Sequence, residues 1–287
     1  MMRWWPRATF ARVGIIMLAA MVLCALLIPA LAPVDPRAIG DVLALRLLPP
    51  FSVDIAGHRH LLGTDKFGRD VLARMMLAGR VSLLVGVIGS VLAAGVGVII
   101  GASSAWLGGV PDRAFTALGD ALLAVPRLIL LLVCAALWRP GTGMVVGVLV
   151  ATGWMGVARV MRAETLGVTA RPFIESATAL GVRPMRILWR HVLPNALAPA
   201  IVATTLGVGS AILLESGLSF LGLGVQPPQP SWGNMLADGR DSIVTAPWIA
   251  LSPGIALIAT VLACTLLGDA LRDRLAGEQA LPLRDRA

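Results

Sequence analysis

The sequence predicts an all-α polytopic membrane protein with six transmembrane helices and both termini in the cytoplasm. Of its 287 residues, 57% are hydrophobic and only 14% are charged, whereas soluble domains carry about 25% charged residues. The mean hydropathy is +0.84. Long uncharged runs recur along the chain, and a membrane helix needs about 20 apolar residues. This composition excludes a disordered chain and argues against a soluble domain.

The first half of the chain contains three predicted spans. The first is the uncharged run 13–34, which follows three arginines. A cleaved signal peptide is the alternative, but its apolar core would be about 7–15 residues long, so we expect an uncleaved helix. The second span is the run 81–111, and the third is expected near 118–138. Pro126 and Arg127 interrupt the third span, and we expect Arg127 near one membrane face, where its side chain can reach water.

The second half contains three further spans, at residues 140–158, 192–214 and 242–268, and each of them is free of charged residues. The stretch 216–237 is also uncharged, but three prolines interrupt it. Proline removes a helical hydrogen bond and clashes with the preceding turn. We therefore expect 216–237 to be a loop.

The distribution of basic residues indicates the orientation. With the N-terminus inside, 15 of the 24 basic residues lie on the cytoplasmic side, and seven of the other nine lie in the segment 35–80. Cytoplasmic loops carry an excess of Lys and Arg, so the chain outside 35–80 favours cytoplasmic termini, while 35–80 itself opposes the rule. The net charge of +8 also suits nucleic-acid binding. Because the arginines separate apolar runs, we expect the lipid bilayer, and no nucleic acid, as a partner.

The sequence contains no recognisable catalytic or metal-binding motif. Its only lysine, Lys66, lacks the glycines of a phosphate-binding loop, so we expect neither nucleotide hydrolysis nor a bound cofactor or metal in this chain. The three cysteines lie far apart, without the spacing of a metal site or a disulfide framework. His58 and His60 flank Arg59 in the polar segment. A metal site is the alternative there, but we expect both histidines to be solvated, because a ligand set needs three or four groups.

Two features within the spans are candidates for packing and function. Gly97 and Gly101 are four residues apart, a spacing that lets two membrane helices approach closely. Small residues are also simply common in membrane helices. Glu215 is the one acidic residue well inside a long uncharged stretch. It is a candidate for the transport pathway, since intramembrane carboxylates are usually functional; the alternative is that it lies in water at the outer end of the fifth span.

The segment 159–195 is too long for a simple turn between spans. A helix is expected to start near Glu175, with an apolar stripe formed by Ile174, Ala177 and Leu180, and to end at Gly181 in a conformation with positive φ. A second helix is expected to begin at Pro184. Three arginines surround this region, at positions 183, 186 and 190. Such a short helix either docks into a groove on another protein or lies on anionic lipid headgroups.

The same segment resembles the Glu-Ala-Ala loop of ABC importer permeases. The resemblance rests on Glu175-Ser176-Ala177, on Gly181 six residues after Glu175, and on Leu193-Pro194. It departs from the general pattern at His191, and 191–195 is similar to the peptide and nickel branch of that family. The resemblance implies that this loop forms the helix coupled to an ATP-binding subunit, with these residues as its site: Glu175, Ser176, Ala177, Leu180, Gly181, His191, Leu193 and Pro194.

Other stretches, at 62–74, 218–224, 230–233 and 267–273, are similar to the C-type permeases of the same branch, so that the resemblance extends from about residue 10 to 275. It implies the type I ABC importer permease fold. The expected division is a first helix with an external segment at 1–79, a permease domain at 80–275 with its coupling loop at 159–195, and a cytoplasmic tail at 276–287.

What the resemblance implies about function is a permease subunit in the bacterial inner membrane. It would form half of a pore for di- or oligopeptides in a heterodimer with a homologous permease. Two partner subunits would bind ATP and Mg²⁺, and an external binding protein would deliver the substrate. Ala177→Trp would then uncouple transport and leave the membrane fold intact. Two alternatives are a nickel or metal-chelate importer of the same family and a secondary transporter, although the latter usually has several charges within its spans.

Overall fold

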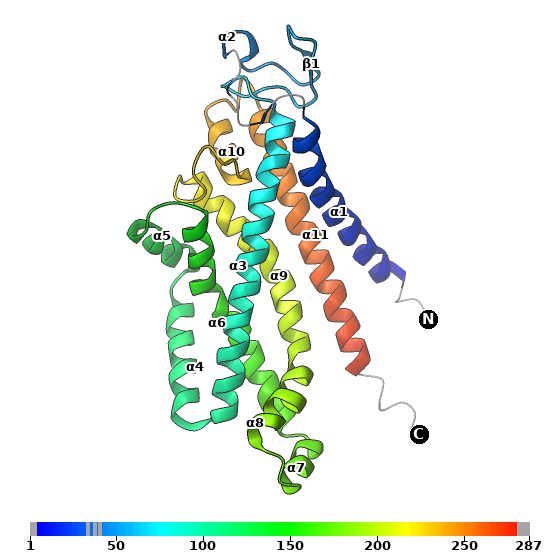
Figure 1. Cartoon of the computed structure of the whole chain (residues 1–287), viewed down its shortest axis with the longest axis vertical. Coiled ribbons are helices and arrows are strands. Elements are labelled where there is room, and N and C mark those ends of the chain that lie inside the picture. The colour runs from blue at the N-terminus through cyan, green and yellow to red at the C-terminus, as the bar shows by residue number, and fades with distance from the viewer. Residues whose placement is uncertain (1–4, 33–34, 37–38, 40–41, 280–287) are drawn as a thin grey trace.

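The structure, a computed structural model, describes residues 5–32, 35–36, 39 and 42–279, which are mainly helical. Figure 1 shows one elongated helical bundle. A two-stranded antiparallel hairpin pairs Ser52 with His60 and Val53 with Arg59. The elements in chain order are α1 (Trp5–Leu31), α2 (Val42–Leu45), β1 (Ser52–Val53), β2 (Arg59–His60), α3 (Val71–Leu107), α4 (Gly109–Ala124), α5 (Arg127–Leu137), α6 (Thr142–Thr169), α7 (Pro172–Ala179), α8 (Pro184–Ile187), the π-helical η1 (Leu188–Val192), α9 (Leu193–Phe220), α10 (Trp232–Arg240) and α11 (Trp248–Gln279).

Five of the described helices are long and apolar enough to cross a membrane: α1, α3, α6, α9 together with α8 and η1, and α11. The predicted third span is instead a bent pair, because 109–124 and 129–137 meet at 95°. The break lies at Pro126, the residue before α5, and residues that precede a proline are disfavoured in the helical conformation. The predicted multi-pass, all-α class is confirmed, with five spans or six if the bent pair counts as one.

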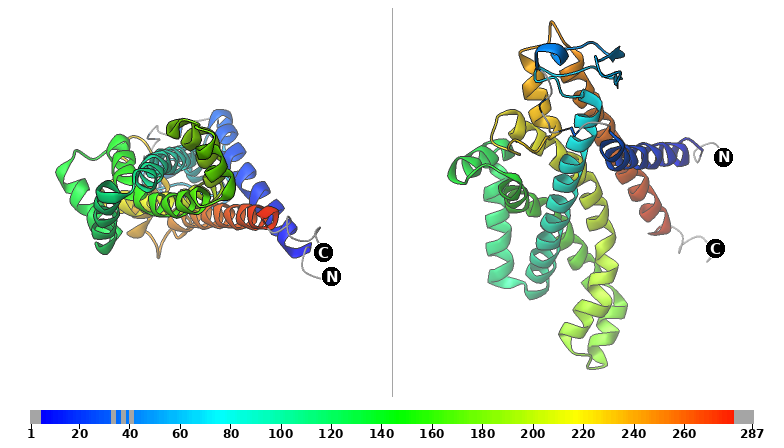
Figure 2. Two further views of the ribbon diagram at one scale, coloured as in Figure 1. Left: turned by 90° about the horizontal axis from the view of Figure 1, so that it is seen from below. Right: turned by 45° about the horizontal axis from the view of Figure 1, so that its top comes forward.

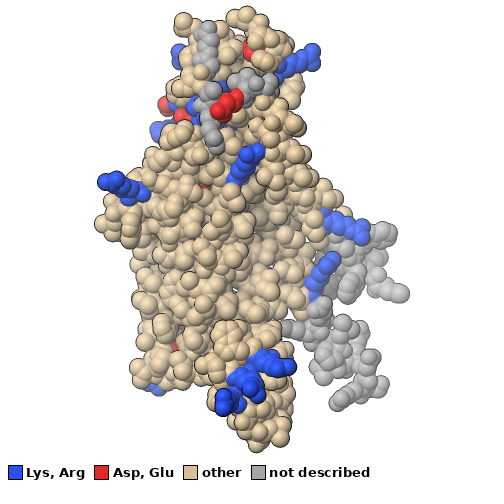
Figure 3. Space-filling view, in the orientation of Figure 1, with Lys and Arg blue, Asp and Glu red and all other residues tan. Residues whose placement is uncertain are grey.

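The elements are distributed between two ends of the bundle. In Figure 1 α2, β1 and α10 lie at the top, and α7 and α8 lie at the bottom. Seen from other directions, α1 and α11 lie on one side of the molecule, and α4 and α5 lie on the opposite side (Figure 2). On the face shown in Figure 3, a broad middle band is largely free of charged side chains, as expected for a surface in contact with lipid.

Several predicted boundaries are wrong. The stretch 216–237 is not a loop throughout, because α9 continues to Phe220 and α10 begins at Trp232. A reciprocal cap starts α10: the Ser231 hydroxyl accepts from the Asn234 N–H, and the Asn234 side chain accepts from the Ser231 N–H. The connection between α6 and α9 begins after Thr169 and not at residue 159, since α6 is longer than predicted. The division of the chain after residues 79 and 275 stays a prediction; these positions lie within α3 and α11.

An arginine of α3 donates hydrogen bonds to backbone carbonyls near the C-terminal end of α1. Pro29 lies inside α1 and has no N–H to donate to the carbonyl of Ala25 four residues earlier. Arg80 of α3 supplies the missing donors: its Nε donates to the Ala25 carbonyl at 2.7 Å and its Nη2 to the Leu26 carbonyl at 2.7 Å. Backbone groups within a membrane must find partners inside the protein, so this contact joins α1 to the bundle.

The polar segment before α3 is attached to α10 by charge. Asp238 of α10 lies 3.1 Å from Lys66 Nζ, 3.6 Å from Arg74 Nη2 and 3.9 Å from Arg69 Nη2. Arg69 Nε also pairs with Asp65 at 2.7 Å. This network explains why 62–74 carries both signs of charge: it fixes the segment against an element more than 160 residues later in the sequence.

The prediction that both histidines are solvated is wrong. His60 is buried, with Nδ1 2.8 Å from Asp70 Oδ2 and Nε2 3.6 Å from Asp54 Oδ2. His58 donates its backbone N–H to Asp54 Oδ1 at 2.8 Å. Desolvation acts to raise the pKa of Asp54, but the hydrogen bonds from His58 and the nearby His60 outweigh it and lower that pKa below its ordinary value. The histidines therefore help to organise the polar segment before α3.

Glycines bring α3 and α6 into backbone contact. A Cβ atom on Gly97 would lie 2.6 Å from the carbonyl oxygen of Trp154, and one on Gly101 would collide with the carbonyl oxygen of Ala158. By contrast, a Cβ atom on Gly95 of the same helix would meet nothing within 4 Å. The Gly97 and Gly101 positions therefore lie at the closest approach of the two helices, which is where small residues are needed.

Gly101→Ala is expected to destabilise the protein, because overpacking costs about 1–3 kcal/mol. Gly95→Ala is the matched control. It adds the same methyl group to the same helix without a collision, and it gains the higher helix propensity of alanine. The measurement is the thermal unfolding midpoint of the purified protein in detergent. Equal midpoints for the two variants would contradict the close α3–α6 packing.

Candidate functional site

The candidate site is the turn formed by α7 and α8 at one end of the bundle (Figure 1). Ile174 of α7 and Ile187 of α8 are 5% and 2% exposed. They belong to one apolar cluster, which we term the end cluster, and Ala177 packs partly against it. Its other buried members come from α3, α6, η1 and α9: Ala94, Ala102, Val157, Met161, Val168, Leu188, Val192, Ala196 and Ala200. One face of α7 therefore joins an apolar cluster to which three of the spanning helices contribute.

The end of α7 is a Schellman motif. The Gly181 N–H donates to the Thr178 carbonyl at 2.9 Å, and the Val182 N–H donates to the Ala177 carbonyl at 3.2 Å. These are the two bonds that define the motif, which requires a residue in the left-handed region at its centre. Gly181 occupies that position with φ of +75°. The predicted positive φ at Gly181 is confirmed, and so are the helix start at Pro184 and the position of Pro194 in the first turn of α9.

Gly181→Val is expected to lower coupled transport by straining this turn. A side chain with a Cβ atom pays about 1 kcal/mol or more in the left-handed region, and a Cβ atom at this position would meet nothing within 4 Å, so the effect is conformational and not steric. Gly181→Asn is the control, because asparagine tolerates this region. The measurement is substrate-stimulated ATP hydrolysis by the assembled transporter. If the two variants behave alike, the left-handed turn is not what matters at this position.

The outward face of α7 carries small and polar side chains beside Phe173, which is 41% exposed. Glu175, Ser176 and Ala179 are exposed, and the Ser176 hydroxyl donates to the Pro172 carbonyl at 3.0 Å. The sequence left open whether Glu175 caps its own helix. In the described part of the chain its carboxylate forms no hydrogen bond or ion pair, and the residue before α7, Arg171, provides no side-chain cap. The Glu175 carboxylate is thus free to meet a partner.

The predicted apolar stripe on this helix is wrong at one position. Ile174 and Ala177 face the bundle, but Leu180 lies beyond the last helical residue of α7 and is 83% exposed. The reason is the left-handed turn at Gly181, since the chain leaves the helical path just where the third residue of the stripe would have faced inward. Leu180 instead adds an apolar contact to the outward surface.

Basic side chains surround this surface. Arg171, Arg183, Arg186 and Arg190 are exposed, and no ion pair involves them within the described residues. Figure 3 shows Lys and Arg gathered near the lower end of the molecule. The two remaining arginines of the segment 159–195 pair with aspartates of α4. Arg162 forms a bidentate salt bridge with Asp112, with both hydrogen bonds at 2.6 Å, and Arg159 donates to Asp120 at 2.5 Å. Those two join α6 to α4.

The last predicted site residues lie where the loop enters α9. His191 is half-buried in η1, and its carbonyl accepts from Asn195 Nδ2 at 2.7 Å. Leu193 begins α9 and packs against the end cluster, and Pro194 follows in the first turn. These residues therefore support the position of α7 from the bundle side, whereas Glu175, Ser176 and Leu180 form its outer surface.

Glu215 is the centre of a buried polar cluster. It is fully buried in α9, so the alternative that it lies in water is wrong. Ser82 of α3 donates to its Oε2 at 2.8 Å, and Ser219 donates to its Oε1 at 2.7 Å. The two hydroxyls in turn accept the backbone N–H groups of Trp232 and Val225 at 3.2 and 3.0 Å. The cluster joins α3, α9 and α10; a role for Glu215 in the transport pathway stays a prediction.

Arg127 lines a cavity inside the bundle. Its side chain lies beside Ser90 of α3, Gly153 of α6 and Gly207 of α9, which lie near the middle of their helices. The expectation that Arg127 lies near a membrane face stays a prediction. An isolated arginine in an apolar run was a visible signal in the sequence, but the cavity depends on how the three helices pack, which hydropathy does not report.

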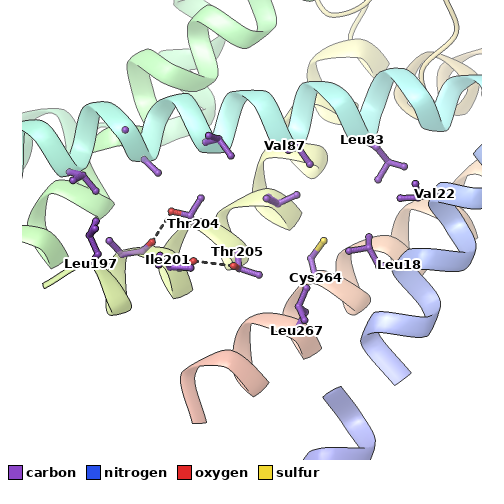
Figure 4. A pocket seen from close by; sticks show the side chains of 16 residues that line it. Leu18, Val22, Leu83, Val87, Leu197, Ile201, Thr204, Thr205, Cys264 and Leu267 are labelled. Atoms are coloured by element: carbon purple, nitrogen blue, oxygen red, sulfur yellow. Dashed lines mark hydrogen bonds between the residues drawn. The ribbon is translucent and has the colours of Figure 1, made fainter. Parts of the chain in front are cut away.

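A larger, apolar pocket of about 430 Å³ lies between α1, α3, α9 and α11 (Figure 4). Leu18, Val22, Leu83 and Leu267 are among the side chains around it. The hydroxyls of Thr204 and Thr205 donate to carbonyls of their own helix, at 2.7 and 3.0 Å. Its lining suits hydrocarbon and provides little to bind a polar solute.

The long apolar helices of the bundle define a multi-pass membrane protein. The chain belongs to the family of binding-protein-dependent transport system inner membrane components, whose model matches residues 96–278. It is therefore a transport component of the inner membrane and not an enzyme.

Three relatives illustrate the similarity. The chain is 38% identical over 266 residues to the di/tripeptide transport system permease protein DppC of Pseudomonas aeruginosa (strain UCBPP-PA14). The matched region covers 91% of this chain and 86% of the relative. Two proteins of Brucella suis biovar 1 (strain 1330) carry provisional names as a peptide transport system permease protein and a peptide permease protein. They are 39% and 40% identical over 262 residues, 91% of this chain and 86% and 84% of theirs.

Proposed function

We propose that this chain forms half of a pore that imports di- or oligopeptides, with a homologous permease as the other half. The similarity to DppC and to the two Brucella relatives, over 91% of the chain, supports peptides over the nickel alternative. The cavity beside Arg127 agrees with this choice, because a guanidinium repels a metal cation.

We assign the proposed partners to the two ends of the bundle. Two ATP-binding subunits, which hold the ATP and Mg²⁺, bind at α7 and at its counterpart on the second permease. This chain itself binds no cofactor. The substrate-binding protein docks at the opposite end, near α10 and the segment 42–70. In this arrangement the α7 end and both termini are cytoplasmic.

The coupling role is supported by the way in which α7 packs against the bundle. Its inner face is fixed to α3, α6 and α9 through the end cluster, while Glu175, Ser176, Ala179 and Leu180 point outward. A displacement of α7 by an ATPase subunit would therefore pass to α6, which α7 contacts, and through the end cluster to α3 and α9. Packed helices shift as units and do not deform continuously, so ATP binding and hydrolysis would drive the bundle between two arrangements.

The test is uptake into proteoliposomes that contain this chain, its second permease and both ATPase subunits, with the binding protein outside and ATP inside. We expect accumulation of a labelled di- or tripeptide that depends on ATP and on the binding protein. Nickel chloride under the same conditions is the comparison. Accumulation of Ni²⁺ without accumulation of peptide would contradict the proposed substrate.

A further inference from the structure

A second cavity, of about 280 Å³, lies between α3, α6 and α9, and Arg127 at the start of α5 projects into it. Its walls are built mainly from small residues near the middle of the three helices: Gly89, Ser90, Ala93, Gly153, Gly156 and Gly207. A Cβ atom on Gly153 would lie 3.2 Å from Arg127 Nη2 and 2.9 Å from the Cβ of Ala93. Gly153 thus provides the space that the guanidinium occupies.

The positive charge of Arg127 has few hydrogen-bonding or ionic partners within the described residues. Its Nε donates to Thr152 Oγ1 at 3.4 Å, a long contact, and that hydroxyl itself donates to the Val148 carbonyl at 2.9 Å. Within the described residues no carboxylate lies within ion-pair distance of Arg127. By contrast, Arg74, Arg159 and Arg162 on the neighbouring helices each meet an aspartate.

A cation inside an apolar helical bundle is costly, and such residues usually face a water-filled cavity and serve function. Arginine is suited to one class of ligand in particular, because its planar fork donates two parallel hydrogen bonds to a carboxylate. Every linear peptide ends in a carboxylate unless it is blocked. The cavity is large enough for that group and a small adjoining portion of a peptide, and its glycines expose no bulky side chains.

We infer that Arg127 and this cavity form a binding site for the C-terminal carboxylate of a peptide as it passes through the pore. The inference rests on the proposed peptide function and adds the residue and the chemical group that it recognises. Thr152 positions the guanidinium through its contact with Nε, and Gly153 leaves the Nη groups open to the cavity.

The experiment compares uptake of labelled Ala-Ala and of its C-terminal amide by the reconstituted complex, at concentrations that saturate the binding protein. Arg127→Gln is expected to lower the rate for the free carboxylate by about ten- to a hundredfold, the value of a hydrogen-bonded charge, and to change the rate for the amide much less. Arg127→Lys should recover part of the loss because it keeps the charge. Arg139→Gln, which alters an exposed arginine after α5, is the matched control and should behave as the wild type.

The outcomes are distinct. An equal loss for both peptides, or no loss, would overturn the carboxylate site while leaving peptide transport established by the wild type. Wild-type complex that imports neither peptide would overturn the proposed function and this inference with it. Binding of the substrate-loaded binding protein to each variant, measured separately, shows whether a loss arises before the peptide enters the pore.

Discussion

Ala179→Trp is expected to abolish coupling while leaving the membrane fold intact. Ala179 is exposed on α7 and makes no contact with the end cluster. An indole there would hold the ATPase subunit away from the helix. Overpacking of an interface costs about 1–3 kcal/mol, which weakens association by about ten- to a hundredfold. The measurement is copurification of the ATPase subunits, together with peptide uptake and ATP hydrolysis stimulated by the loaded binding protein.

The structure changes which substitution tests this idea. Ala177→Trp, which the sequence alone suggested, places the indole against the end cluster, so a loss of transport could arise from a damaged fold. Ala114→Trp is the matched control for Ala179→Trp, because Ala114 is also an exposed alanine but lies on α4. If α7 instead lies on lipid headgroups, Ala179→Trp should strengthen anchoring. Normal ATPase assembly and normal stimulated hydrolysis in Ala179→Trp would therefore contradict the coupling role.

Glu215→Leu is expected to destabilise the protein strongly. The substitution removes the acceptor of the Ser82 and Ser219 hydroxyls, both of which are buried. Each buried polar group left without its partner costs about 1–3 kcal/mol, and the same hydroxyls hold the backbone at Trp232 and Val225. We expect a lower unfolding midpoint and poor assembly, measured by thermal unfolding and by the yield of intact complex.

Glu215→Gln separates a packing role from a role in the transport pathway. The amide oxygen can accept from one serine, and the amide nitrogen can donate to the other, whose oxygen has two lone pairs. If the carboxylate serves mainly to join α3, α9 and α10, this variant should keep near-normal stability and peptide uptake. Loss of uptake with an unchanged unfolding midpoint would show instead that the carboxylate acts in transport.

Much of the site's local geometry was predictable because it is encoded by neighbouring residues. The left-handed turn at Gly181 follows from a glycine placed directly after a short helical run, and the structure shows φ of +75° there. Pro184 and Pro194 mark helix starts for the same kind of reason, since proline suits the first turn of a helix. The break of the third span at Pro126 was visible in sequence, but its 95° angle was not.

Features that depend on distant contacts were not predictable in the same way. His60 was expected in water and is buried, and the cavity that Arg127 lines was not foreseen. In both cases the environment comes from other elements: the carboxylates of Asp54 and Asp70, and the small residues of α3, α6 and α9.

The sequence by itself determined the class of protein, five of the predicted spans and the position of the loop before α9, because hydrophobic length and local glycine and proline chemistry act over short stretches of chain. Only the tertiary structure decided which face of α7 is free, where Glu215 finds its serine donors and which cavity Arg127 lines. Those properties depend on which helices pack together, and that depends on backbone approach at positions such as Gly101 and Gly153. Hydropathy reports how apolar a residue is, whereas packing decides what that residue meets.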